Sequence, residues 1–288
     1  MTAITKWMLA AGLVFCCSAA SSLDFGDELK KALREGVQQK LDAKSGSSTE
    51  SALPTFGNTS QEDEIAIGRQ IAGNLLGASA LVKDARLQKY VNNVGRWVAS
   101  QSERPDLPWH FGVIESNDVN AFAAPGGYIF ITRGLYRMLQ NEADLAGVLG
   151  HEIGHVIRKH HLKILQQSQL LDFGGRLLAK QAGGNDKAQQ LIGSGAEVVA
   201  RSLDKNAEFE ADRIAVVLAT RAGYDSFGLP EVLQQVGHFA KDDGSVALLF
   251  KTHPHPDDRL EKLGAAMSDR FDDIKGQTLA TRFYRIKP

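Results

Sequence analysis

The residues most suited to chemistry are two histidines four apart with a glutamate between them, His151-Glu152-Ile153-Gly154-His155. On an α-helix, positions four apart differ by about 40° around the axis, so both imidazoles project from one face. Imidazole nitrogens bind zinc, and a neighbouring carboxylate can accept a proton from an activated water. The pattern predicts a zinc ion held by His151 and His155, with Glu152 as general base.

The alternative is a structural helix that carries two incidental histidines. Gly150 and Gly154 argue against it, because each glycine weakens a helix interior by about 1 kcal/mol. Glycine is useful at these positions if another part of the chain must approach the backbone closely. We therefore expect a close neighbour on this face of the helix.

A catalytic zinc takes three protein ligands and keeps a fourth position open. Both cysteines, Cys16 and Cys17, lie in an N-terminal stretch typical of a signal peptide, and cleavage after Ala20 would remove them. The third ligand must then be His, Glu or Asp. The run Glu208-Phe209-Glu210-Ala211-Asp212 is the candidate. Glu208 can bind the metal and Asp212 can accept the free N–H of a zinc-bound histidine, whereas Glu210 points about 160° away and is expected in solvent. Spacing alone leaves open that this run is simply a charged helix surface.

Periodicity and turn residues predict the elements that position these groups. Apolar residues at helical spacing, each run preceded by a capping residue such as Ser60 or Asn141, indicate helices, and alternation after Pro108 indicates strands. We expect helices that begin after the caps Ser60, Thr132 (near Gly134) and Asn141, and further helices over 84–100, 196–222, 230–240 and 256–267. The expected strands are 109–114, 119–123 and 128–132. This is a small sheet set among helices.

The N-terminus predicts export. Lys6, the apolar run Trp7–Cys17 and the small residues Ser18-Ala19-Ala20 are typical of a signal peptide over residues 1–20. Lipid attachment at Cys16 is an alternative that the bulky Phe15 argues against. An amphipathic helix and linker are expected over 21–60 and a single catalytic domain over 61–288. No later segment is apolar enough to span a membrane, and a net charge of -1 offers no general attraction for nucleic acid.

The His151/His155 pair, the Glu208-Phe-x-Ala-Asp212 run and the later Thr252-His253-Pro254 segment occur in an order that resembles the Ste-twenty-four/HtpX-like zinc metallopeptidases, metallopeptidase family forty-eight. The resemblance extends from about Gln61 to Met267, and it is strongest to the soluble periplasmic branch associated with the outer membrane. It implies an α+β, mainly helical, zincin-like (gluzincin) fold with a small sheet beside the zinc-binding helix. It also implies Glu208 as the third ligand and Asp212 as the partner of a ligand histidine.

The same resemblance implies a substrate-binding strand and roles for His253 and Arg259, whereas the remaining expectations for the site come from the sequence itself. An extended substrate would pair with the strand that holds Asn120, Ala121, Phe122 and Ala123, although a plain structural hairpin fits as well. His253 would either donate to the oxyanion or fill the open zinc position in a latent state. Arg259 would lie near the metal as a further catalytic residue that helps to stabilise the oxyanion. His110, His160, His161 and His238 show no ligand pairing, and His160 and His161 are expected in water near a helix end. The glycine-rich stretch 172–195 could cover the cleft as a lid.

These expectations together predict a periplasmic zinc endopeptidase with one zinc ion per chain and Glu152 as general base. It would hydrolyse peptide bonds in exported or misfolded envelope proteins. Outer-membrane proteins or their assembly machinery are candidate partners, and a tether to the outer membrane is a further option. The alternative function is a chaperone-like assembly factor with a latent zinc site, which His253 would close.

Overall fold

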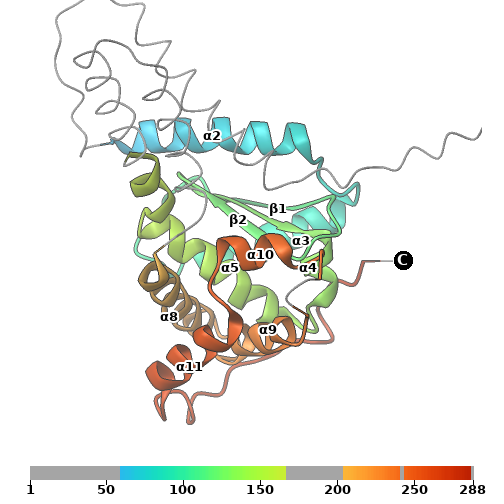
Figure 1. The fold of residues 1–288 in the computed structure, drawn as a ribbon, viewed down its shortest axis with the longest axis vertical. Coiled ribbons are helices and arrows are strands. Elements are labelled where there is room, and N and C mark those ends of the chain that lie inside the picture. Colours follow the sequence, from blue (N-terminus) through green and yellow to red (C-terminus); the bar gives the residue numbers. More distant parts are fainter. Residues whose placement is uncertain (1–58, 167–203, 241–242, 287–288) are drawn as a thin grey trace, which may run out of the picture.

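The computed structural model describes residues 59–166, 204–240 and 243–286. The expected signal peptide, the N-terminal helix and the glycine-rich stretch 172–195 lie outside these residues. Helices surround a small sheet in the described part (Figure 1). Its elements are α2 (Gln61–Ala78), α3 (Ala85–Ala99), β1 (His110–Ile114), β2 (Ala121–Ala124), β3 (Tyr128–Thr132), α4 (Arg133–Met138), α5 (Glu142–Ile157), α8 (Lys205–Arg221), α9 (Gly228–Gly237), α10 (Ala247–Thr252) and α11 (Pro256–Met267). The predicted α+β, mainly helical fold is confirmed.

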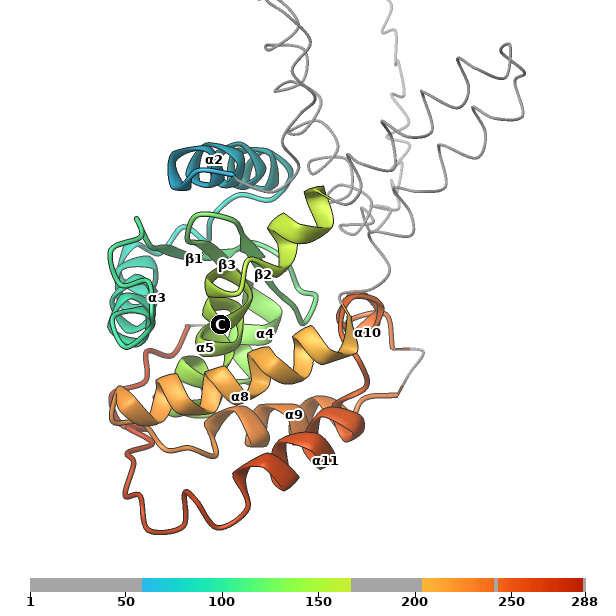
Figure 2. The same ribbon diagram turned by 90° about the vertical axis from the view of Figure 1, so that its left-hand side faces the viewer.

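The three strands lie in the order β1-β3-β2, with β1 parallel and β2 antiparallel to β3. Alternate residues face opposite sides of a strand. One side of the sheet, with Phe122 and Phe130, packs on α2, and the other, with Ile129 and Ile131, packs with α3 and α5 in the main core. Figure 2 shows α2 above the sheet, with α8, α9 and α11 below α5. The helix expected to carry the chemistry is thus enclosed between the sheet and the C-terminal helices.

Side-chain caps fix where several helices begin. Ser60, Asp84, Thr132 and Asn141 each accept a hydrogen bond from a backbone N–H in the first turn of the helix that follows. Such a cap satisfies a donor that the helix leaves free. These starts agree with the sequence prediction, as do the bounds of β3 and α11. The short helix α10 was not predicted.

Gly150 and Gly154 lie where α5 crosses α8. A methyl group added at Gly150 would lie 3.1 Å from the Ala215 Cα, and one added at Gly154 would lie 3.1 Å from the Ala211 Cα. The neighbours are helix backbone, which cannot easily move aside. The expected close approach is confirmed, and it brings the backbone of α8 against the helix of the two histidines.

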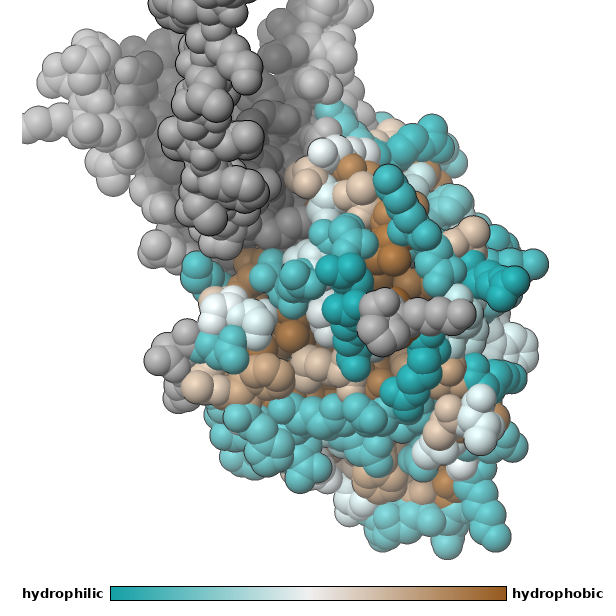
Figure 3. All heavy atoms as spheres, turned by 90° about the vertical axis from the view of Figure 1, so that its right-hand side faces the viewer, coloured by the Kyte–Doolittle hydropathy of each residue, from teal (hydrophilic) through white to brown (hydrophobic). Residues whose placement is uncertain are grey.

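The described surface has few large apolar side chains. Figure 3 shows one face on which hydrophobic residues appear mainly in recesses between hydrophilic ones. Trp97 is the most exposed of the large hydrophobic residues in the described part, at 54%. Within the same residues, no helix is both long enough and apolar enough to cross a membrane.

We expect Gly154→Val to lower the free energy of unfolding by about 1–3 kcal/mol, because the larger side chain must push α8 away from α5. Urea denaturation measures this change. Gly73→Ala is the control, since nothing lies within 4 Å of a methyl group there, and it should raise stability by about 0.5–1 kcal/mol. Equal stability of Gly154→Val and the unchanged protein would contradict the close contact.

Candidate metal centre

The two histidines of α5 point into one buried site. Every residue of α5 is buried, and the Nε2 atoms of His151 and His155 lie 3.0 Å apart. Polar side chains at the centre of a core need partners, because desolvation without compensation costs several kcal/mol. The two nitrogens lie close enough together to bind one ion.

Glu208 reaches the same point from the first turn of α8. Its Oε2 lies 3.5 Å from Nε2 of His151 and its Oε1 lies 3.5 Å from Nε2 of His155. The side chain is 0% exposed, and neither oxygen has a hydrogen-bond partner among the described residues. Burial raises the pKa of Glu208, but the neighbouring His253 and His151 outweigh burial and lower this pKa to about 2. An ionised, unpartnered carboxylate beside two imidazoles fits a divalent cation, and its N and O donors suit zinc.

Asp212 lies one turn further along α8 and orients His151. Its Oδ1 lies 2.9 Å from Nδ1 of His151, which leaves Nε2 of that ring to face Glu208. Arg259 donates to both oxygens of Asp212, at 3.0 Å from Nε and 2.5 Å from Nη2. Burial raises the pKa of Asp212, but the Arg259 guanidinium holds it well below the usual range. Arg259 therefore contacts the site through Asp212 and His151, not as a free donor.

The electrostatics of His151 follow from these neighbours. Burial and the Arg259 charge lower its pKa, but the neighbouring carboxylates of Asp212 and Glu208 outweigh them and raise it to about 9. In the metal-free protein this ring can hold a proton, so a metal ion must displace that proton to bind.

His253 is a fourth donor at the end of α10. Its Nε2 lies 3.8 Å from Oε2 of Glu208, and one ligand atom from each of His151, His155, Glu208 and His253 lies within 4.8 Å of the others. Its other ring nitrogen is 2.9 Å from the Thr252 hydroxyl. Burial lowers the pKa of His253 to about 4, so the ring is neutral near pH 7 and can bind a metal. This placement is compatible with both predicted roles, a fourth ligand or a donor beside an open position.

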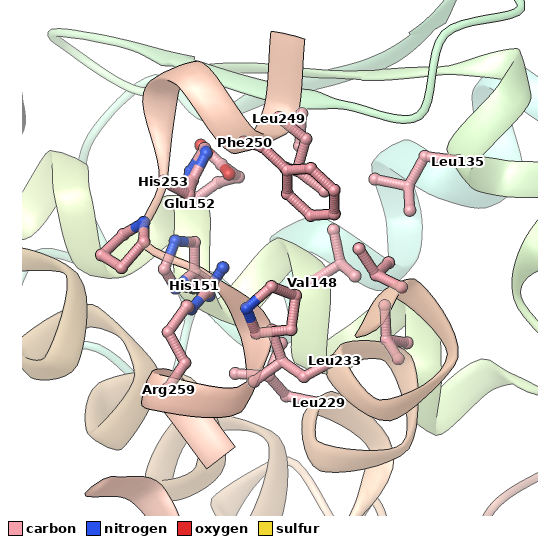
Figure 4. Close-up of a pocket in the computed structure, with 15 residues that line it drawn as sticks. Leu135, Val148, His151, Glu152, Leu229, Leu233, Leu249, Phe250, His253 and Arg259 are labelled. Atoms are coloured by element: carbon pink, nitrogen blue, oxygen red, sulfur yellow. Dashed lines mark hydrogen bonds between the residues drawn. The ribbon is translucent and has the colours of Figure 1, made fainter. Parts of the chain in front are cut away.

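Glu152 faces the pocket that adjoins the metal ligands. Burial raises its pKa to about 7, so the carboxyl can gain or lose a proton near neutral pH. In Figure 4 the polar groups of His151, Glu152, His253 and Arg259 gather on one side of this pocket. The opposite side is apolar and is formed by Leu135, Val148, Leu229, Leu233, Leu249 and Phe250. A proton acceptor therefore lines the same pocket as two of the candidate ligands, His151 and His253, opposite an apolar wall.

The predicted substrate strand lies beside α5. Ala121–Ala124 form β2, which no strand flanks on its outer edge within the described residues, and Ala121 lines the pocket. Asn120 precedes β2, is 0% exposed, and has an Nδ2 that lacks a hydrogen-bond partner in the described part. Phe122 packs against α2 on the other face of the sheet.

The expectation for His160 was wrong. We expected it in water, but it is 6% exposed and its Nδ1 lies 3.0 Å from Nδ1 of His155. Glu210, also expected in solvent, is only partly exposed and lies 3.4 Å from Nε2 of His160. His161 is half-buried, with its ring centroid 5.3 Å from that of His155. The side chain of His255 caps α11 by accepting a hydrogen bond from the Asp257 N–H.

Comparisons with known proteins agree with this geometry. The model of a family described as Peptidase family M48 matches residues 85–267. The chain is 30% identical over 223 residues to the beta-barrel assembly-enhancing protease of Yersinia pestis, which covers 72% of this chain and 46% of that protein. It is 30% identical over 224 residues to the Escherichia coli protein of the same name, covering 72% and 45%. It is also 26% identical over 187 residues to the mitochondrial metalloendopeptidase OMA1 of Arabidopsis thaliana, covering 65% and 37%. The matched part spans less than half the length of these relatives.

We expect the unchanged protein to bind one zinc ion per chain and Glu208→Gln to bind it about 100-fold more weakly or not at all, because the amide lacks the negative charge. Chelator competition and elemental analysis measure this. Glu261→Gln, an exposed carboxylate on α11, is the control and should bind zinc normally. Full zinc affinity in Glu208→Gln would contradict its role as a ligand.

Proposed function

The chain belongs to peptidase family M48, and on that basis we propose that it is a zinc-dependent endopeptidase. The observation that carries the proposal is the buried carboxylate of Glu208, which lies beside Nε2 of His151 and His155 and has no hydrogen-bond partner in the described part of the chain. Those three side chains would hold the metal, and Asp212 would fix the tautomer of His151. The name of the Arabidopsis thaliana relative, a metalloendopeptidase, supports the same class of reaction.

Zinc, when bound, would polarise the scissile carbonyl and lower the pKa of an attacking water. Glu152 accepts the proton of that water and passes it to the leaving amine, a role suited to a carboxyl whose pKa burial raises to about 7. His253 can donate to the developing oxyanion if its ring does not occupy the metal. Arg259, paired with Asp212, acts by holding the partner of His151.

An extended polypeptide fits the outer edge of β2. Its backbone would add to the sheet beside Ala121–Ala124, which binds many sequences because main-chain hydrogen bonds carry the affinity. The buried Asn120 would support the start of this strand, because its side-chain oxygen accepts a hydrogen bond from the Ala121 N–H. The apolar recess that adjoins Glu152 would accept an apolar side chain next to the scissile bond.

For the setting, we propose hydrolysis of exported or misfolded envelope proteins in the periplasm. The support is the predicted signal peptide and the name of the two bacterial relatives, beta-barrel assembly-enhancing protease. Outer-membrane proteins or their assembly machinery would be the partners, with tethering to the outer membrane as an option.

A second candidate is a chaperone-like assembly factor with a latent zinc site. The observation that favours it is the fourth donor, His253, which would complete a closed set of ligands. A factor of this kind would bind unfolded client proteins with or without chelator, whereas the peptidase would lose all hydrolysis of casein when zinc is removed.

We expect Glu152→Gln to bind zinc normally and to lose hydrolysis of casein by about 10²–10⁴-fold, because the amide cannot accept the proton. Zinc content and initial rates are compared on the same preparation. A purified Glu152→Gln protein with full activity would refute the general-base assignment.

The apolar recess gives a second expectation, for cleavage preference. Peptides with Leu, Met or Phe at one position next to the scissile bond should have a kcat/KM about 10-fold or more above the matched Ala peptide, because a larger side chain fills the recess. Sequencing the products of a peptide library measures this. Equal cleavage beside Ala, Asp and Leu would show that the recess does not take part in substrate selection.

A further inference from the structure

We propose that His160 and Glu210 are positioning residues that orient the ligand His155, an inference that rests on the proposed zinc site. His151 has a direct carboxylate partner in Asp212. Among the described residues, His155 has no such direct partner at its Nδ1, which instead meets the ring of His160. The carboxylate of Glu210 lies behind that second ring.

The distances define a chain of contacts that starts at the candidate metal position. Nε2 of His155 faces Nε2 of His151 at 3.0 Å and Oε1 of Glu208 at 3.5 Å. On the other side of the ring, Nδ1 lies 3.0 Å from Nδ1 of His160. Nε2 of His160 then lies 3.4 Å from Oε2 of Glu210. His155 and His160 are 1% and 6% exposed, so little water reaches the inner contact.

These contacts permit only one placement of the protons on the neutral rings of His155 and His160. A metal ion on Nε2 of His155 leaves the ring proton on Nδ1, which must donate to His160. Nδ1 of His160 is then an acceptor, and its proton lies on Nε2, facing Glu210. Each ring N–H then has an acceptor, His160 for His155 and Glu210 for His160. The negative charge of the Glu210 carboxylate favours this arrangement, as in carboxylate–histidine–zinc sites.

The backbone is bent where it must be for this contact. On an unbroken helix, a residue five positions after His155 would point about 140° away from it. The helix α5 ends at Ile157, and Lys159 takes a left-handed conformation with φ of 57°. A non-glycine residue there costs about 1 kcal/mol. The turn brings the His160 ring back onto His155, and the Lys159 ammonium lies 3.4 Å from the buried Glu64 carboxylate.

Glu210 is itself held in place. Nε of Arg158 lies 2.9 Å from its Oε1, so the turn that supplies His160 also supplies a cation for the carboxylate. Glu210 and Asp212 both belong to α8, the helix that carries Glu208. One helix would thus provide a metal ligand and the terminal carboxylate behind each of the two ligand histidines.

The test measures zinc affinity by chelator competition for four variants of the full chain. His160→Ala removes the acceptor and should weaken zinc binding about 10–100-fold. His160→Asn can place a side-chain oxygen near the former Nδ1, so it should recover most of that loss. Glu210→Gln keeps the shape of a partly exposed side chain and should weaken binding by a smaller factor. His161→Ala removes a neighbouring ring that makes no hydrogen bond to His155, and should leave affinity unchanged.

The variants must also be non-additive. Adding Glu210→Gln to His160→Ala should cause no further loss, because Glu210 acts only through His160. Unchanged zinc affinity in His160→Ala, or equal losses in His160→Asn and His160→Ala, would overturn the proposal. If His160→Ala does not fold, Glu210→Gln with full zinc affinity is the result that overturns it.

Ring ¹⁵N NMR of the zinc-loaded protein reports the tautomer of His160, which a role in packing alone would not determine. His160 should be neutral with its proton on Nε2, and the opposite tautomer would contradict the chain of contacts. Failure of the proposed function is distinguishable, because the unchanged protein would then bind no zinc or hydrolyse no casein. If only the positioning role fails, the unchanged protein still binds zinc and hydrolyses casein, and the His160 and Glu210 variants bind zinc as tightly as the unchanged protein.

Discussion

Glu208 lies in the interior with a carboxylate that is ionised and has no hydrogen-bond partner in the described part of the chain. A buried charge without a nearby counter-charge is costly, so this carboxylate needs a cation beside it, either a bound metal ion or, in the metal-free protein, the protonated His151 ring. The contact between α5 and α8 makes the site possible. Because Gly150 and Gly154 carry no side chain, the backbone of α8 lies against α5 and Glu208 reaches the two imidazoles.

The carboxylates near this point differ because their surroundings differ. Glu208 lies among imidazoles and Asp212 is paired with Arg259, so the pKa of each is lowered despite burial. Among the described residues Glu152 has no such close partner and lines the pocket with the apolar recess, so burial raises its pKa to about 7. Groups of one chemical type thereby acquire distinct capacities, two as permanent anions and one as a proton acceptor.

Much of the fold could be predicted from local signals. Capping residues such as Asn141 and Thr132, and the alternation in β1 and β3, act within a few residues and were identified correctly. The pairing of the α5 histidines is also local, since it depends only on helical periodicity. The location of His160 was not predictable in this way, because one left-handed residue at Lys159 reverses where the side chain points. The attachment of Arg259 to Asp212 depends on how α11 packs on α8, which no spacing within one helix reveals.

The central claim is that His151, His155 and Glu208 converge on a single divalent cation. Anomalous diffraction at the zinc edge from crystals of the zinc-loaded protein tests it most directly. We expect one peak per chain, about 2.0–2.2 Å from Nε2 of each histidine and from a carboxylate oxygen of Glu208. A peak elsewhere, or a Glu208 carboxylate turned away from the ion, would contradict this account.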